Sequence, residues 1–177
     1  MSRMTARRRQ TALVLSLVSV VATTGCQVSR LQFRNDDRLQ FSAPASRALV
    51  KAPLTVSWEM TDFTPSGLDG SSSNRSGAFA VFVDRAPMPV GKDLKWLARS
   101  DSGCKRDPRC PDATYLADRG VYLTTDQTLT IPTLPAAGDG VGDEQHYVNV
   151  VLVDGTGHRI GESAWYRPFT SKRRSTS

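Results

Sequence analysis

Hydrophobic and polar positions alternate along several short stretches of this chain, a spacing typical of β-strands that have one wet face. The clearest stretch spans residues 54–61, in which Leu54, Val56, Trp58 and Met60 fall on one face. Threonine, serine and glutamate occupy the other face. The spacing therefore predicts a sheet with one side in a core and the other in water.

Shorter hydrophobic runs bounded by turn residues predict further strands. Residues 78–83 (AFAVFV) are apolar at every position, which is typical of a strand in mid-sheet that is covered on both sides. The segment Asp154-Gly155-Thr156-Gly157 separates two runs and predicts a hairpin. In all, seven or eight strands are expected, at residues 38–42, 49–50, 54–61, 78–83, 121–123, 128–131, 147–153 and 159–166.

Two segments have helical character. Residues 93–98 place Leu94, Leu97 and Ala98 on one helical face, and residues 111–120 begin with proline and end with glycine, as short helices often do. Strands nevertheless dominate. The patterns predict a mainly β protein, an antiparallel β-sandwich with one or two short helices in inserted loops, formed by a single domain over residues 38–169.

Residues 43–58 (APASRALVKAPLTVSW) resemble the opening of bacterial immunoglobulin-like surface domains. In those domains a strand end containing proline, a short turn and a Val-x-Trp strand recur. The resemblance covers 16 residues and implies an immunoglobulin-like sandwich with Trp58 packed between the sheets. Alternation alone predicts the same core position for Trp58.

The first 26 residues have the organisation of an export signal. Four arginines precede an apolar run over residues 12–22, and the first acidic residue is Asp36. As a helix the run would be roughly 16 Å long, about half the thickness of a bilayer core, so it is too short for a permanent anchor. It ends at Gly25-Cys26.

This segment resembles the lipobox of bacterial lipoprotein precursors, in which the cysteine thiol is diacylated before cleavage. The resemblance implies a signal peptide over residues 1–25, a diacylglycerol on Cys26, a tether over residues 26–37 and anchoring at the outer face of the cell membrane. Thr23 departs from the family, which usually has an aliphatic residue there. An ordinary secretory signal cut near Thr24 is the alternative, and the export route, Sec or Tat, stays open.

The leader, residues 80–89 and residues 154–165 also resemble a group of small actinobacterial lipoproteins. That resemblance brings no activity with it.

The cysteine count is odd, which in an exported protein needs an explanation. If Cys26 carries lipid, Cys104 and Cys110 remain, and five residues separate them. In an oxidising compartment they are expected to form a disulfide that closes a small surface loop. Metal binding is the rival use, but the spacing is not C-x₂-C and neither histidine is near in sequence.

Most of the net charge of +6 comes from the leader. Removing its four arginines from the 23 basic residues leaves 19 against 17 acidic ones. Part of that excess lies in residues 170–177, which we expect to be a basic disordered tail. The body is near neutral, so a nucleic-acid partner is not indicated.

Candidate binding residues gather around the cysteine loop. Trp96, Tyr115 and Tyr122 lie before and after it, and aromatic residues on loops can contact sugars or peptides, although core packing is the alternative for each. The favoured interpretation is a lipid-anchored extracytoplasmic binding module of the bacterial envelope, for a protein, peptide or cell-wall ligand. No catalytic residue, metal or cofactor is predicted.

An extracytoplasmic enzyme is the main alternative, and a purely structural envelope protein is another. An enzyme would have to join distant polar residues such as Asp84, Asp154, His158 and Glu162 in one pocket. His146 or His158 could serve a Ser-His-acid triad, but nothing in the spacing selects one.

Two further motifs give weaker indications of function. Gly155-Thr156-Gly157 is not followed by a predicted helix, so a phosphate loop is disfavoured. Calcium binding by the acidic loop 139–144, through Asp139, Asp143 and Glu144, stays open.

Overall fold

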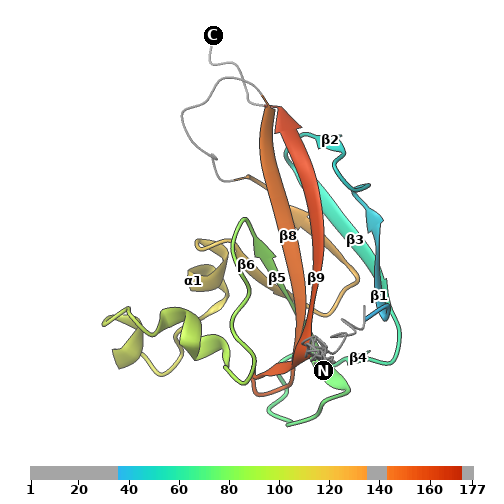
Figure 1. Ribbon diagram of the computed structural model, residues 1–177. Coiled ribbons are helices and arrows are strands. Elements are labelled where there is room, and N and C mark those ends of the chain that lie inside the picture. Colours follow the sequence, from blue (N-terminus) through green and yellow to red (C-terminus); the bar gives the residue numbers. More distant parts are fainter. Residues whose placement is uncertain (1–35, 135–142, 173–177) are drawn as a thin grey trace, which may run out of the picture. The chain divides into compact units, whose positions relative to one another are not determined.

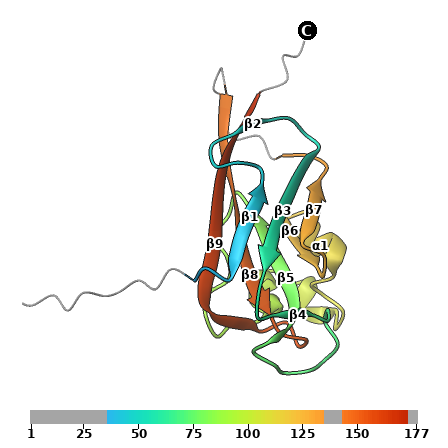
Figure 2. The same cartoon turned by 90° about the vertical axis from the view of Figure 1, so that its right-hand side faces the viewer.

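Two β-sheets face each other in a computed structural model of the chain (Figures 1 and 2), which describes residues 36–134 and 143–172. The predicted signal peptide, the predicted lipidation site Cys26, most of the predicted tether and Asp139 lie outside these residues. So do residues 173–177 of the predicted tail.

The smaller sheet has three antiparallel strands, in the order β1 (Leu39–Ala43), β3 (Leu54–Met60) and β7 (Thr128–Ile131). The larger sheet has the order β2-β9-β8-β5-β4, and β6 also pairs with β5. Within it, β2 pairs in parallel with β9, and β4 pairs in parallel with β5. The other pairs are antiparallel. One sheet is curled into a half-barrel. The bounds are β2 (Leu49–Val50), β4 (Thr64–Pro65), β5 (Ser76–Val83), β6 (Val121–Thr124), β8 (Asp143–Val153) and β9 (Arg159–Lys172).

The prediction of a mainly β fold with two sheets is confirmed, but β8 and β9 are longer than their hydrophobic runs. Asp143 and Glu144, expected in the acidic loop, begin β8. β9 continues to Lys172, so it includes the first three residues of the predicted tail. The polar ends of the two strands pair with each other, with Asp143 opposite Lys172 and Glu144 opposite Ser171. Pairing provides hydrogen-bond partners for their backbone N–H and C=O groups.

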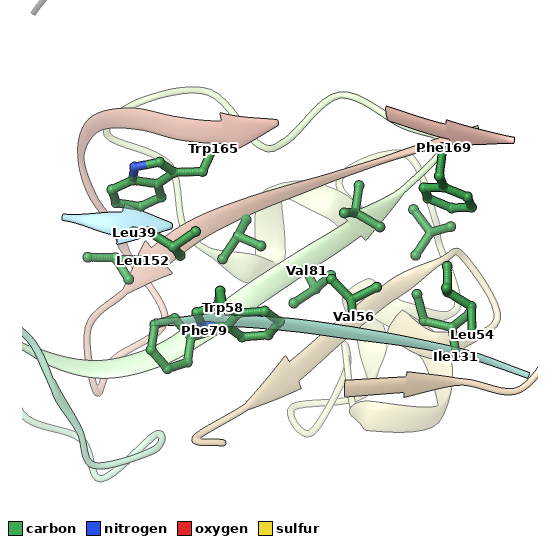
Figure 3. Packing of buried hydrophobic residues seen from close by; sticks show 13 residues of the cluster. Leu39, Leu54, Val56, Trp58, Phe79, Val81, Ile131, Leu152, Trp165 and Phe169 are labelled. Carbon is green, nitrogen blue, oxygen red and sulfur yellow. The ribbon is translucent and has the colours of Figure 1, made fainter. Parts of the chain in front are cut away.

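The main core lies between the two sheets (Figure 3). Trp58 of β3 is 2% exposed and packs edge-to-face on Phe79 of β5, with ring centroids 5.3 Å apart. This confirms the predicted position of Trp58. Each large apolar side chain buried in this way stabilises the fold by roughly 1.5–3 kcal/mol. The core residues are Leu39, Leu54, Val56, Trp58, Phe79, Val81, Val83, Ile131, Val148, Val150, Leu152, Trp165 and Phe169.

A second core lies on the opposite face of β5. Ala78, Ala80 and Phe82 alternate with the residues of the main core and are fully covered, which confirms a strand buried on both faces. The cover comes from residues 84–120, here called the insertion, which joins β5 to β6. The buried side chains that it contributes to this core are Met88, Leu94, Leu97 and Leu116.

The insertion contains the predicted short helices. It holds two 3₁₀ turns, η1 (Leu94–Ala98) and η2 (Cys104–Arg106), and the helix α1 (Ala113–Ala117). The Asp93 carboxylate accepts a hydrogen bond from the backbone N–H of Trp96 at the start of η1. Asp112 caps α1 in the same way through the N–H of Tyr115. Such caps stabilise helical turns that are too short to persist alone.

Candidate functional site

A disulfide closes the outermost loop of the insertion. Cys104 and Cys110 are bonded, with their Cα atoms 5.1 Å apart, so the predicted pair is present. Cys104 is itself buried at 8% exposure. The bond therefore ties an exposed loop to a covered position, and the loop has little freedom to change shape.

Two aromatic residues of the insertion carry an arginine stacked on the ring. The guanidinium carbon of Arg99 lies 3.5 Å from the ring centroid of Trp96, and that of Arg119 lies 3.6 Å from the ring centroid of Tyr115. Both rings are half-buried and pack against the second core. Tyr122 lies in β6 and packs against the main core, on the other side of the sheet. Trp96 of η1 and Tyr115 of α1 thus both belong to the insertion, and Tyr122 is separated from them by the sheet.

Most acidic side chains of the insertion accept hydrogen bonds from its backbone. Besides the two caps, Asp101 accepts hydrogen bonds from the N–H groups of Gly103 and Cys104, and Asp107 accepts one from Arg109 N. The bond from the N–H of Cys104 does most to lower the pKa of Asp101. Burial raises that pKa, but Tyr115, Gly103 and Arg119 also lower it, so the pKa lies below its ordinary value. Most acids of the insertion are therefore used to hold its own backbone.

A polar hollow of about 600 Å³ opens on the insertion. Two guanidinium groups, from Arg85 and Arg119, and three hydroxyl groups line it. Arg85 Nη1 donates to the backbone carbonyl oxygen of Arg119 at 2.8 Å, which holds the Arg85 guanidinium against the backbone beside Arg119. The lining residues are Arg85, Leu97, Ser100, Asp101, Ser102, Tyr115 and Arg119. This set of donors can hold an oxyanion.

A second candidate site is a buried polar cluster at the far end of the β8–β9 ladder. His146 is 2% exposed, and its Nδ1 lies 2.6 Å from Asp84 Oδ2. Its Nε2 lies 2.9 Å from Ser171 Oγ and 3.7 Å from Glu144 Oε2. The imidazole also stacks on Phe169. Asp84 is held by the N–H of Tyr147, which donates to Oδ1 at 2.8 Å.

The residues named for an enzyme do not form one pocket. Asp154 and His158 meet in the β8–β9 turn, where Asp154 Oδ1 accepts from the N–H groups of Thr156 and His158. Burial opposes ionisation of Asp154, but these bonds keep its pKa below the ordinary value. Asp84 instead pairs with His146, and Glu162 is exposed on β9.

The glycine motif and the metal hypothesis can also be placed. Residues 155–157 form the turn of the β8–β9 hairpin and a strand follows them, as expected. Over residues 36–134 and 143–172, no three potential ligand side chains lie close enough to hold a metal ion. Within the same residues, no helix has the length and apolar character needed to cross a bilayer.

Comparisons with protein-family models, with curated proteins and with solved structures found no match to this chain. The geometry of the insertion and of the buried cluster is therefore the ground for a functional proposal.

Proposed function

We propose that this protein is a lipid-anchored binding module of the bacterial cell envelope and that the insertion is its ligand-contact face. The Gly25-Cys26 leader motif supports the lipid anchor. The Cys104–Cys110 disulfide supports a place outside the cytoplasm, because disulfides persist in oxidising compartments. Two acyl chains would hold the protein at the membrane far longer than one.

One observation carries the binding role: the insertion is held in place by several contacts and presents half-buried aromatic rings with arginines stacked on them. Its apolar underside packs on β5, the disulfide closes its loop, and aspartate caps fix its helical turns. Binding residues are commonly held on loops by a rigid scaffold, since little entropy is then lost on binding. Tryptophan, tyrosine and arginine, the types stacked here, are also the residues that dominate binding energy at interfaces.

The immunoglobulin-like form of the sandwich is part of the proposal. The strand order supports it, since β1-β3-β7 corresponds to strands A, B and E, and β5-β8-β9 to strands C, F and G. The chain departs from antibody domains in that its buried tryptophan between the sheets, Trp58, lies on β3 and not on the strand equivalent to C. The insertion then occupies the connection after strand C.

The anchor is tested by localisation. Replacing Cys26 by serine should move the protein from the membrane fraction to the soluble exported fraction and abolish labelling by a palmitate analogue. A Cys104→Ser control should keep both properties. Unchanged membrane retention and labelling of the C26S protein would contradict lipidation at this residue.

The binding face is tested by photo-crosslinking in living cells. A crosslinker placed at Lys92 or Lys105, both exposed on the insertion, should capture the same partner or glycan repeatedly. Asp126 is the matched control, because it is exposed on the β6–β7 turn outside the insertion. Equal capture from Asp126, or no capture from abundant anchored protein, would count against this face.

A second candidate function, serine-dependent acyl transfer, is favoured by the order of contacts Asp84–His146–Ser171. It places a hydroxyl, an imidazole and a carboxylate in the sequence used by serine hydrolases. Ser171 is only 7% exposed and lies within a paired strand, so we rank this function second. A fluorophosphonate probe would label Ser171 of such an enzyme and fail to label the S171A protein.

A further inference from the structure

We propose that the hollow between Arg85 and Arg119 binds a phosphate group of the ligand, so that the binding module recognises a phosphate-bearing molecule of the envelope. The inference rests on the proposed function and names the chemistry of its ligand. The donors that line the hollow, the charge that remains there and the basic excess of the insertion support it.

The hollow offers more hydrogen-bond donors than its own residues use. Each guanidinium has five N–H donors. In the described part of the chain, the Arg85 guanidinium donates one hydrogen bond, to the backbone carbonyl oxygen of Arg119. The Arg119 guanidinium donates two, to the backbone carbonyl oxygen of Tyr115 at 3.2 Å and to Asp101 Oδ2 at 3.4 Å. The hydroxyl groups of Ser100 and Ser102 are exposed at the same hollow. A phosphate group, with three or four oxygens, can accept from more of these donors than a carboxylate can.

The hollow keeps a positive charge despite Asp101. One Asp101 oxygen accepts from Gly103 N and Cys104 N, and the other faces Arg119 Nη2. Two guanidinium groups and one carboxylate therefore leave a net charge of +1 at the hollow. The Tyr115 ring under Arg119 holds the guanidinium plane in place, so its remaining edge is already oriented for an oxyanion.

The insertion that carries the hollow has a small excess of basic residues. Over residues 84–120, eight lysines and arginines outnumber six aspartates, and exposed bases lie on η1 and on the disulfide loop. Clustered charge of one sign raises the local concentration of the opposite ion, an effect that salt weakens. The exposed bases are Lys95, Arg99, Lys105, Arg106 and Arg109.

The test uses purified protein carrying Cys26→Ser, titrated with inorganic phosphate and followed by amide NMR. We expect saturable shifts at Ser100, Asp101 and Ser102, and at least a tenfold loss of affinity in R85Q and in the double variant S100A and S102A. The serine double variant removes only exposed hydroxyl groups. A loss of affinity in that variant therefore reports on the hollow and not on misfolding. R75Q, which removes an exposed arginine outside the insertion, should bind as the unchanged protein does.

Two results would overturn the inference: equal affinity in R85Q, the serine double variant and R75Q, or binding of acetate as tight as that of phosphate. The source of the phosphate is then resolved with two probes, glycerol phosphate and phosphatidylglycerol vesicles. Competition by glycerol phosphate alone supports a soluble or polymer-borne phosphate, and preferential binding to vesicles that R85Q abolishes supports a lipid headgroup.

The outcomes distinguish a failure of the phosphate inference from a failure of the proposed binding function. Capture of a partner from Lys105 together with no phosphate binding would retain the binding face and reject its ligand chemistry. Phosphate binding without capture from living cells would retain the site and reject the macromolecular partner proposed for it.

Discussion

At the residue scale, Asp36 holds the start of the described chain to the sandwich. Its carboxylate accepts from Arg38 Nε at 2.9 Å and Nη2 at 2.7 Å, and its carbonyl accepts from the indole N–H of Trp165 at 2.6 Å. The Arg38 bond, opposed by burial and assisted by Ser163, lowers the pKa of Asp36 to about 2 from an ordinary value of 3.8. The first described residue is therefore fixed to β9.

The lowered pKa predicts an acid-dependent loss of stability. Since the folded state binds its proton less readily than the unfolded state, the contribution of Asp36 is complete above pH 3.8 and is lost as pH falls towards about 2. Solvent screening of the partly exposed pair limits it to roughly 1 kcal/mol. Urea unfolding between pH 2 and pH 6 should show a smaller pH slope for D36N. An unchanged slope would place the acid sensitivity elsewhere.

Gly77 makes a second residue-scale prediction, because its backbone has φ of 146° and a Cβ atom there would overlap the carbonyl oxygen of Val153. Gly77→Ala should cost roughly 3 kcal/mol or more, since backbone of two paired strands must separate. Gly70, at φ of 83°, is the matched control, because a Cβ there meets nothing within 4 Å. Gly70→Ala should cost about 1 kcal/mol from conformation alone. Similar losses of unfolding free energy in both variants would refute the steric argument.

At the element scale, one disulfide closes the exposed loop of the insertion. Replacing Cys104 and Cys110 by serine should cost about 2 kcal/mol, because the closed loop is short. The loss should be local, since the apolar underside of the insertion remains packed on β5. Hydrogen exchange should quicken over residues 99–112 and stay slow in β8 and β9. Equal quickening in those strands would mean that the disulfide supports the whole sandwich.

The elements that the sequence predicted well are those whose pattern is local. β3, β5 and β7 follow from alternation or an apolar run, and α1 from its flanking Pro111 and Gly120. The two-residue strand β4 and the polar ends of β8 and β9 were missed or shortened. Those segments are strands because a partner supplies their hydrogen bonds, and pairing over long separations leaves no local pattern.

At the scale of the whole molecule, the His146 cluster joins three distant parts of the chain. Asp84 is 62 residues from His146, and Ser171 is 25 residues from it. Sequence spacing therefore could not select this histidine or its partners, although it did select the cysteine pair. Of the three aromatic residues that it grouped, Tyr122 lies apart from Trp96 and Tyr115. Asp84 is the first residue of the insertion and has φ of 52°, so the cluster fixes the point where the insertion leaves the sheet.

The cluster should therefore stabilise the sandwich and the base of the insertion together. His146→Phe leaves Asp84 without its buried partner and should cost roughly 2–3 kcal/mol, since unpaired buried polar groups are unfavourable. Asp84→Asn should cost less, and a double-mutant cycle should give a coupling of roughly 1–3 kcal/mol. Urea unfolding measures these values.

Ser171→Ala separates the structural role of the cluster from the catalytic one. It removes one hydrogen bond to His146 Nε2 and should cost only about 1 kcal/mol. If the cluster is a structural tie, S171A protein keeps ligand capture at Lys105, while H146F loosens residues 84–90 in hydrogen exchange. Additive effects of the Asp84 and His146 substitutions would instead show that the 2.6 Å contact between Asp84 Oδ2 and His146 Nδ1 does not stabilise the fold. That result would favour the acyl-transfer function.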